Sequence, residues 1–326
     1  MKSFEYAEPR TEEEAVEFLQ DAGTTAVVLA GGTDLMGLLK KMVVTPDRVV
    51  NIMEVDSLKE IRLLPDGSLA IGSAVTLDEL LADPHLADYG GILDAVHGIN
   101  SMQLQSQGTL GGEVLRRPQC WYFRRDGELL DGRRVIEGDN RYHAILGNQG
   151  PAKFVSASRI APCLIALGAQ ARLRCAEGER WCDVADLFQI PRRADQQENT
   201  LAPGELVTHF VLPPAGALQS ATYEVRHGAG PDMPLAAAAA VLEFSGQRVK
   251  EAQVVMGQVA PIPWRADAAA EVLVGHRVDE RLAAEAGRVA VAQATPLSHN
   301  EYKVQLAQTA VRRAVLRAAG LETGGF

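Results

Sequence analysis

The stretch Val27-Val28-Leu29-Ala30-Gly31-Gly32-Thr33-Asp34-Leu35-Met36-Gly37-Leu38-Leu39-Lys40 decides how the rest of the chain is interpreted. A short apolar run with strand character leads into two glycines and two small polar residues, and an apolar pattern with helical spacing follows. Glycines let the backbone approach an anion closely, and the N–H groups that open a helix favour negative charge. The pattern therefore predicts a phosphate site, while an ordinary tight turn is the alternative interpretation.

A second glycine segment, Gln107-Gly108-Thr109-Leu110-Gly111-Gly112-Glu113-Val114-Leu115, repeats this arrangement. It again places a Gly-Gly pair beside a small hydroxyl residue. Two such backbones can hold the two phosphates of a dinucleotide from opposite sides, whereas two unrelated turns would need no ligand. Neither segment is the G-x-x-x-x-G-K-[ST] loop or the G-x-G-x-x-G fingerprint.

The bulk composition is that of a globular protein with two or three domains. The chain has 326 residues, 47% hydrophobic and 23% charged, with a net charge of −10. This acidic balance excludes the basic face that nucleic-acid binding needs. The N-terminus has no apolar leader, and the longest apolar run, 234–242, is too short to span a bilayer. We therefore expect no membrane insertion and a cytoplasmic location.

The four cysteines, Cys120, Cys163, Cys175 and Cys182, contain no C-x-x-C pair. This spacing predicts free thiols rather than a zinc site or a thioredoxin-like redox pair. The sequence also holds no recognisable acid–base or metal-ligand constellation, so we predict no catalytic side chain and no metal site.

Helix and strand signals in the first half indicate a small α/β unit followed by a mixed region. Thr11 and Glu14 form a capping box for a helix over 9–22, ended by Gly23. Thr76 and Glu79 form a second capping box. The other elements expected here are strands at 26–30 and 48–52, a hairpin of 61–64 with 69–72, and a helix at 91–97.

The second half reads as surface connections and then a separate α+β domain. Basic residues flank three aromatics in 116–125, which predicts an aromatic turn or a subunit contact, and 126–140 reads as a surface loop. We expect a helix at 161–167, strands at 169–175 and 206–212, a short helix at 183–188 and a boundary at Pro213-Pro214. Strands at 221–225, 234–244 and 249–256 precede helices at 265–274, 278–293 and 300–319.

Several motifs occur in an order that resembles one known family. They are Ala30–Leu35, Ile71–Leu80, Gly108–Gly112, Pro203–Leu206, Met256–Arg265, and Tyr302 ahead of Arg312-Arg313-Ala314. Together they resemble the FAD-binding medium subunit of the xanthine dehydrogenase family of molybdenum hydroxylases. That family includes carbon monoxide dehydrogenase, aldehyde oxidoreductases and 4-hydroxybenzoyl-CoA reductase. The resemblance covers nearly the whole chain.

The resemblance implies an α+β fold in three parts: a small FAD-binding α/β subdomain over 1–55, a larger α+β subdomain over 56–214, and a C-terminal sheet-plus-helices domain over 215–326. It implies FAD as cofactor. It also implies two partners, a small subunit with [2Fe-2S] clusters and a large subunit with the molybdenum cofactor. Electrons would pass from the clusters through FAD to NAD or another acceptor. The alternatives are a stand-alone FAD-dependent oxidoreductase that acts on a small organic substrate, and a scaffold that keeps the fold without FAD.

The residues expected to contact FAD come mainly from the two glycine segments. They act chiefly through backbone donors, with the hydroxyls of Thr33 and Thr109 assisting. The full set is Leu29, Ala30, Gly31, Gly32, Thr33, Asp34, Leu35, Thr76, Gly108, Thr109, Gly111, Gly112, His143 and Ser158.

The sequence departs from the family pattern at some positions. The family usually has Asn at the position of Glu113 and Asp at the position of Arg159. It also places a Lys near the position of Glu224, for which Arg226 is the candidate substitute here. Relatives with a similar aromatic segment often bind a [4Fe-4S] cluster through four cysteines, whereas only Cys120 remains here and Phe154 stands near the fourth position. Because such a cluster normally needs four thiolates, we predict none. The departures leave the electron acceptor and the retention of partners open.

Overall fold

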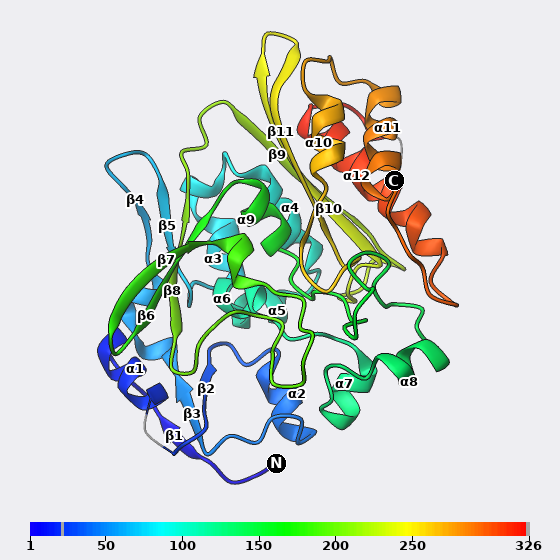
Figure 1. The fold of residues 1–326 in the computed structure, drawn as a ribbon. Coiled ribbons are helices and arrows are strands. Elements are labelled where there is room, and N and C mark those ends of the chain that lie inside the picture. The colour runs from blue at the N-terminus through cyan, green and yellow to red at the C-terminus, as the bar shows by residue number, and fades with distance from the viewer. Residues whose placement is uncertain (21–22, 324–326) are drawn as a thin grey trace.

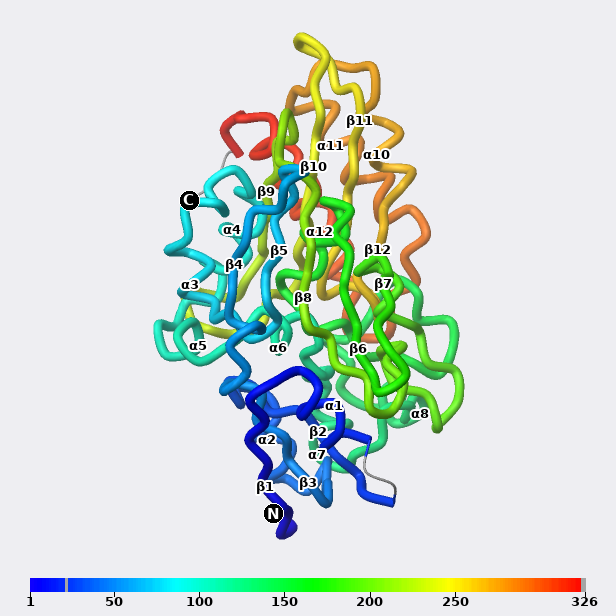
Figure 2. The backbone as a smooth tube through the Cα atoms, turned by 90° about the vertical axis from the view of Figure 1, so that its left-hand side faces the viewer, coloured from blue at the N-terminus to red at the C-terminus, as the bar shows by residue number. Residues whose placement is uncertain are grey.

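The computed structural model describes residues 1–20 and 23–323, and three β-sheets organise them (Figure 1). The first sheet has the strand order β1-β3-β2, the second β4-β5-β8-β6-β7 and the third β12-β11-β10-β9. The sheets take their strands from 5–51, 61–212 and 218–265, in that order. Figure 2 shows the first sheet at one end of the molecule and the third, with its helices, towards the other. The fold class is the predicted α+β; the proposed domain limits stay a prediction.

The N-terminal unit is parallel, with helices as its crossovers. Its elements are β1 (Glu5–Ala7), α1 (Glu12–Gln20), β2 (Ala26–Leu29), α2 (Leu35–Lys40) and β3 (Arg48–Asn51). Both outer strands pair with β3 in parallel. The predicted strand, glycine turn and helix are confirmed. The helix expected over 9–22 begins three residues later, and the end of that range lies outside the described residues.

The second sheet is antiparallel throughout and carries the helices that hold the second glycine segment. Its strands are β4 (Ile61–Leu63), β5 (Leu69–Gly72), β6 (Gln170–Cys175), β7 (Gly178–Asp183) and β8 (Leu206–Leu212). The 3-10 helices η1 (Ile52–Glu54), η2 (Asp56–Lys59), η3 (Pro84–Leu86) and η4 (Val184–Leu187) link elements in this region. The α-helices are α3 (Leu77–Ala82), α4 (Gly90–Gly98), α5 (Met102–Gln107), α6 (Leu110–Val114), α7 (Trp121–Asp126), α8 (Gly132–Glu137) and α9 (Ala161–Ala166). The predicted hairpin is confirmed as β4 and β5.

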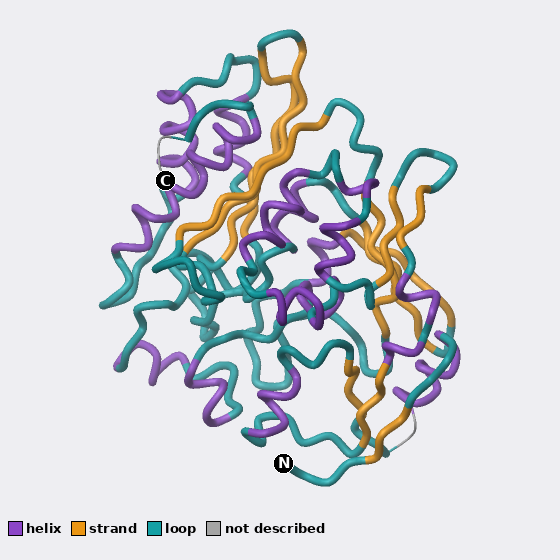
Figure 3. The backbone as a smooth tube through the Cα atoms, turned by 180° about the vertical axis from the view of Figure 1, so that it is seen from behind, coloured by secondary structure: helices purple, strands orange, loops and turns teal. Residues whose placement is uncertain are grey.

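The C-terminal sheet lies between two layers of helices (Figure 3). Its strands are β9 (Leu218–Val225), β10 (Ala236–Ser245), β11 (Arg248–Gly257) and β12 (Trp264–Arg265), and its helices are α10 (Asp267–Leu273), α11 (Glu280–Ala290) and α12 (Tyr302–Ala318). Strand β10 is buried on both faces. Ala238 and Ala240 join the core that includes α12, whereas Ala239 and Val241 join the core that includes α4 and α9. Its side chains are therefore apolar on both faces rather than alternating.

One expectation about the second half was wrong. The segment 126–140 is not simply a loop, because it contains α8, whose N-cap Asp131 accepts a hydrogen bond from the Arg134 N–H at 3.3 Å. The short helix expected at 183–188 is confirmed, as the 3-10 helix η4.

No described helix has both the length and the apolar character needed to cross a bilayer.

Candidate functional site

The two glycine segments lie in direct contact. A Cβ atom placed on Gly31 would lie 1.4 Å from the carbonyl oxygen of Gln107 and 3.3 Å from the Gly108 nitrogen. No side chain fits such a gap, so Gly31 is required for the two backbones to approach each other. Gly32 has φ of +70°, a conformation that favours glycine. The fold therefore brings the two segments together, and their binding of a dinucleotide stays a prediction.

The first segment offers unused backbone donors. The N–H groups of Gly32, Thr33 and Asp34 donate no hydrogen bond within 1–20 and 23–323. Residues 29–35 are half-buried, so a ligand can reach them. Adjacent free N–H groups in a glycine turn are a common anion-binding arrangement.

The second segment packs on the block 71–76. The Gly111 N–H donates to the Ser73 carbonyl at 2.8 Å, and the Leu77 N–H donates to the Gly108 carbonyl at 2.9 Å. A Cβ atom on Gly111 would lie 2.8 Å from the Cβ atom of Ser73. The contact brings a third family-like motif to the same place as the two glycine segments.

Hydroxyls at this contact mainly cap helices. The Thr109 hydroxyl accepts from the Gly112 N–H at 3.2 Å and so caps α6. Glu79 accepts from the N–H and the hydroxyl of Thr76, both at 2.7 Å, as the capping box predicts. The N–H groups of Gly111 and Gly112 are thus already used, and the second segment has fewer free donors than the first.

Ser73 is a candidate site residue that our sequence interpretation missed. Its side chain is buried, and its hydroxyl has no hydrogen-bond partner within the described chain. An unpartnered buried hydroxyl beside the glycine contact fits a polar ligand. Its place between Gly72 and Thr76 in the block 71–76 was the available signal. This hydroxyl and the free amides of the first segment are suitable hydrogen-bond donors for FAD, so the residues present fit that cofactor.

Asp34 anchors the first segment to α7 instead of capping α2. Although it occupies the N-cap position, its side chain makes no capping hydrogen bond. It forms an ion pair with Arg124 at 2.8 Å and accepts from the Arg117 N–H at 3.0 Å and from Gln119 at 3.1 Å. We therefore assign its carboxylate to holding the loop in place.

Replacing Asp34 by Ala should loosen this loop. Arg124, whose side chain is 12% exposed, would lose its carboxylate. We expect about 2–4 kcal/mol of lost stability and weaker FAD binding, measured by thermal unfolding and flavin fluorescence titration. Asp126→Ala is the matched control, because Asp126 also pairs with arginines, Arg125 on α7 and Arg134 on α8, but is 33% exposed. Equal effects of the two substitutions would contradict the anchoring role.

Two other predicted residues, His143 and Ser158, lie away from the glycine contact. Nε2 of His143 lies 3.2 Å from the Cys120 sulfur, and its ring packs near Trp121. Burial, with the nearby Lys303 charge, lowers the pKa of His143 to about 4, so the imidazole is neutral at pH 7. The Ser158 hydroxyl accepts from the Ala161 N–H at 3.0 Å, at the start of α9. No contact of either side chain reaches the glycine segments within the described residues.

The three departures from the family pattern lie together. The Arg159 N–H donates to the Glu113 carboxylate at 3.0 Å, and Nε of Arg159 lies 3.5 Å from the Glu224 carboxylate. All three side chains are almost fully buried. Burial is the main cause that raises the pKa of Glu224. The three departures therefore form one buried cluster of opposite charges.

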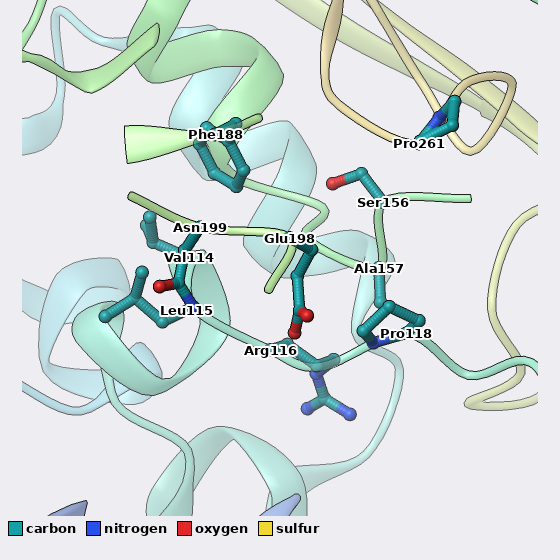
Figure 4. A pocket seen from close by; sticks show the side chains of 10 residues that line it. All are labelled: Val114, Leu115, Arg116, Pro118, Ser156, Ala157, Phe188, Glu198, Asn199 and Pro261. Carbon is teal, nitrogen blue, oxygen red and sulfur yellow. The ribbon is translucent and has the colours of Figure 1, made fainter. Parts of the chain in front are cut away.

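A hollow with an empty volume of about 280 Å³ lies at the C-terminal end of α6. Figure 4 shows Phe188 and Pro261 on opposite sides of it, with Glu198 directed towards the segment that carries Arg116. Glu198 also pairs with Arg117 through both carboxylate oxygens.

A second hollow, of about 200 Å³, is lined by Cys120 and Phe154 among others. The resemblance leaves Cys120 as a remaining cluster cysteine and places Phe154 near the position of the fourth ligand. Among the residues that the structure describes, no group of three His, Cys, Asp or Glu side chains is arranged to hold a metal ion. The absence of a [4Fe-4S] cluster stays a prediction.

Comparison with known proteins decides the family. Residues 2–215 match the family described as "FAD binding domain in molybdopterin dehydrogenase", and residues 221–318 match "CO dehydrogenase flavoprotein C-terminal domain". The chain belongs to the FAD-binding family of the molybdopterin dehydrogenases. It is an FAD-binding subunit of an oxidoreductase, as predicted, and FAD is its cofactor.

Similar proteins support this membership along the full length. The aldehyde oxidoreductase FAD-binding subunit PaoB of Escherichia coli (strain K12) is 30% identical over 319 residues, which cover 94% of this chain and 96% of that protein. The carbon monoxide dehydrogenase medium chain of Afipia carboxidovorans is 29% identical, with 97% and 96% covered. The structure of reconstituted CO dehydrogenase from Oligotropha carboxidovorans matches with a TM-score of 0.77 and 27% identity, covering 98% of this chain and 99% of that one.

Proposed function

We propose that this FAD-binding chain is the electron-transfer subunit of a molybdenum hydroxylase. In this proposal it passes electrons from the [2Fe-2S] clusters of a small partner subunit to NAD or another acceptor. A large subunit with the molybdenum cofactor would oxidise the organic substrate. The observation that carries the proposal is the contact of Gly31 with Gln107, which joins the two glycine segments in a chain whose relatives are named as medium or FAD-binding subunits.

The first segment would hold the diphosphate of FAD through the free N–H groups of Gly32, Thr33 and Asp34. Ser73 would add a hydroxyl hydrogen bond from the facing block. Bound FAD accepts electrons singly and releases them as a pair, which suits it to lie between one-electron clusters and a hydride acceptor. The protein's own contribution is to orient the cofactor and to control the charge around it.

The test is to purify the tagged chain from its native host without oxygen. We expect a bound flavin together with a [2Fe-2S] subunit and a molybdenum-cofactor subunit. Bleaching of the flavin by NADH would identify a nicotinamide acceptor, whereas flavin that stays oxidised would point to another acceptor. A chain that carries flavin but no partner, and whose flavin a small organic substrate reduces directly, would support the stand-alone alternative instead. A preparation with partners but without flavin would contradict the proposal.

A further inference from the structure

A buried ionic cluster includes Glu113 of the second glycine segment. Glu113 follows Gly112 in the chain and pairs with Arg116 at 2.9 Å. Arg159 lies against Glu113 through its backbone N–H, and its guanidinium faces Glu224 on β9. The cluster therefore connects the cofactor-binding part of the chain with the C-terminal sheet.

The Arg159 guanidinium is fixed from two sides. Nη1 donates to the Gly98 carbonyl at 2.8 Å, and Nη2 donates to the Asp232 carbonyl. Arg226 also donates to the Gly98 carbonyl, at 2.6 Å, and its Nε lies 3.8 Å from Glu224. Gly98 has no room for a side chain here, since a Cβ atom would lie 2.5 Å from a Glu224 oxygen. The charged groups are thus held in one arrangement.

The facing polar atoms of this cluster are not hydrogen-bonded. Within the described part of the chain, Nε of Arg159 and both carboxylate oxygens of Glu224 lack a hydrogen-bond partner. Their side chains are only 2% and 6% exposed. Buried polar atoms without partners are costly, so simple stabilisation does not explain them. These groups nevertheless form ion pairs, Arg159 with Glu224 at 3.5 Å and Arg226 with Glu224 at 3.8 Å, so they interact through charge rather than through hydrogen bonds.

The charges of the cluster do not cancel. Two carboxylates, of Glu113 and Glu224, face three guanidinium groups, of Arg116, Arg159 and Arg226. Arginine stays protonated even when it is buried. In a medium of low dielectric constant, the excess positive charge acts over a longer distance than it would in water. A reduced flavin is the more electron-rich form, and a nearby positive charge stabilises it.

We propose that Arg159 and Glu224 are positioning residues that tune the reduction potential of the bound flavin by their opposite charges. Arg159 raises the potential and Glu224 lowers it. The inference rests on the proposed function, because it requires a flavin at the glycine contact. It assigns the cluster to the control of electron transfer rather than to domain stability.

The test compares the flavin midpoint potentials of the wild-type holoprotein, Arg159→Gln and Glu224→Gln. Burial raises the pKa of Glu224. The positive charges of Arg159 and Arg226 oppose that shift, whereas the negative charge of Glu113 adds to it. Potentials are therefore measured at pH 8.5, where ionisation of Glu224 is favoured. We expect a more negative potential for Arg159→Gln and a more positive one for Glu224→Gln. Shifts in the same direction, as general loosening would give, or no shift in either variant, would overturn the inference.

Two further variants separate charge from structure. Arg159→Lys keeps the charge but loses the forked hydrogen bonds, so its potential should stay near the wild-type value even if FAD binds about tenfold more weakly. Arg180→Gln removes another guanidinium, on β7 of the second sheet, which pairs with Glu205 just before β8 at 2.6 Å and 2.9 Å. This variant should leave the potential unchanged. If Arg159→Gln does not fold, the inference is tested with Glu224→Gln and Arg159→Lys. A wild-type-like potential in Glu224→Gln would then refute the inference. A wild-type chain without flavin would instead contradict the proposed function.

Discussion

Gly31→Ala is expected to abolish stable FAD binding. The new methyl carbon would lie 1.4 Å from the Gln107 carbonyl oxygen, a distance that no rotamer change can relieve because both partners are backbone atoms. The two glycine segments must then move apart, and the diphosphate of FAD is no longer held between them. We expect at least about a hundredfold weaker binding, which corresponds to about 3 kcal/mol. The measurement is the dissociation constant of FAD, obtained by reconstituting the flavin-free chain and following flavin fluorescence.

Gly37→Ala is the matched control for this experiment. Gly37 lies in α2, a few residues after Gly31, and nothing lies within 4 Å of the position that its Cβ would occupy. Alanine has the higher helix propensity, so this substitution should leave FAD binding unchanged and raise stability by up to about 1 kcal/mol. If Gly31→Ala retained one flavin per chain with normal affinity, the contact of the two segments would be only a structural turn.

Local signals in the sequence were enough to predict several elements. Pro65-Asp66-Gly67 predicted the β4–β5 hairpin, because a turn sequence separates two apolar runs. Thr76 and Glu79 predicted the start of α3, because a capping box satisfies helix N–H groups that would otherwise lack partners. In both cases the deciding residues lie within a few positions of the element itself.

Strand β7 and helix α8 were not predicted, because their stability comes from neighbours. Strand β7 pairs only with β6, and most of its residues are exposed, so it shows no buried apolar alternation. Pairs across the two strands, such as Arg172 with Glu179 at 2.6 Å, help to hold it. Helix α8 has a single buried residue, Val135, and its polar sequence resembles a loop.

The site was predictable only in part. The sequence identified both glycine segments, but not the free amides of one and the occupied amides of the other. Glu113, Arg159 and Glu224 appeared as three separate departures, because their proximity depends on packing among α6, the segment before α9, and β9. Long-range contacts of this kind leave no local pattern in a single sequence.

Lys303→Met should destabilise the chain more than most single substitutions. The Lys303 side chain is 1% exposed, at the start of α12. Its Nζ donates to three carbonyls, those of Tyr142 at 3.2 Å, His143 at 3.1 Å and Gln258 at 2.7 Å. Asn300 also donates to the His143 carbonyl, so that carbonyl keeps a hydrogen-bond donor in the variant. The carbonyls of Tyr142 and Gln258 would lose the donor that Lys303 supplies. We expect a loss of about 2–4 kcal/mol, seen as a Tm lower by about 4–12 °C.

The pH dependence distinguishes this buried amine from an ordinary surface lysine. Burial lowers the pKa of Lys303 to about 7 from its usual value of 10.5. Between these two values the unfolded chain binds more protons at this site than the folded chain, so the contribution of Lys303 to stability rises with pH. The difference in Tm between wild type and Lys303→Met should therefore widen from pH 7 to pH 9.5. Lys250→Met, which removes a half-exposed lysine paired with Glu243, should show a small difference that does not widen. A constant difference for Lys303→Met would mean that the buried amine keeps its charge in the folded protein and that its three carbonyl acceptors, rather than burial, control its protonation.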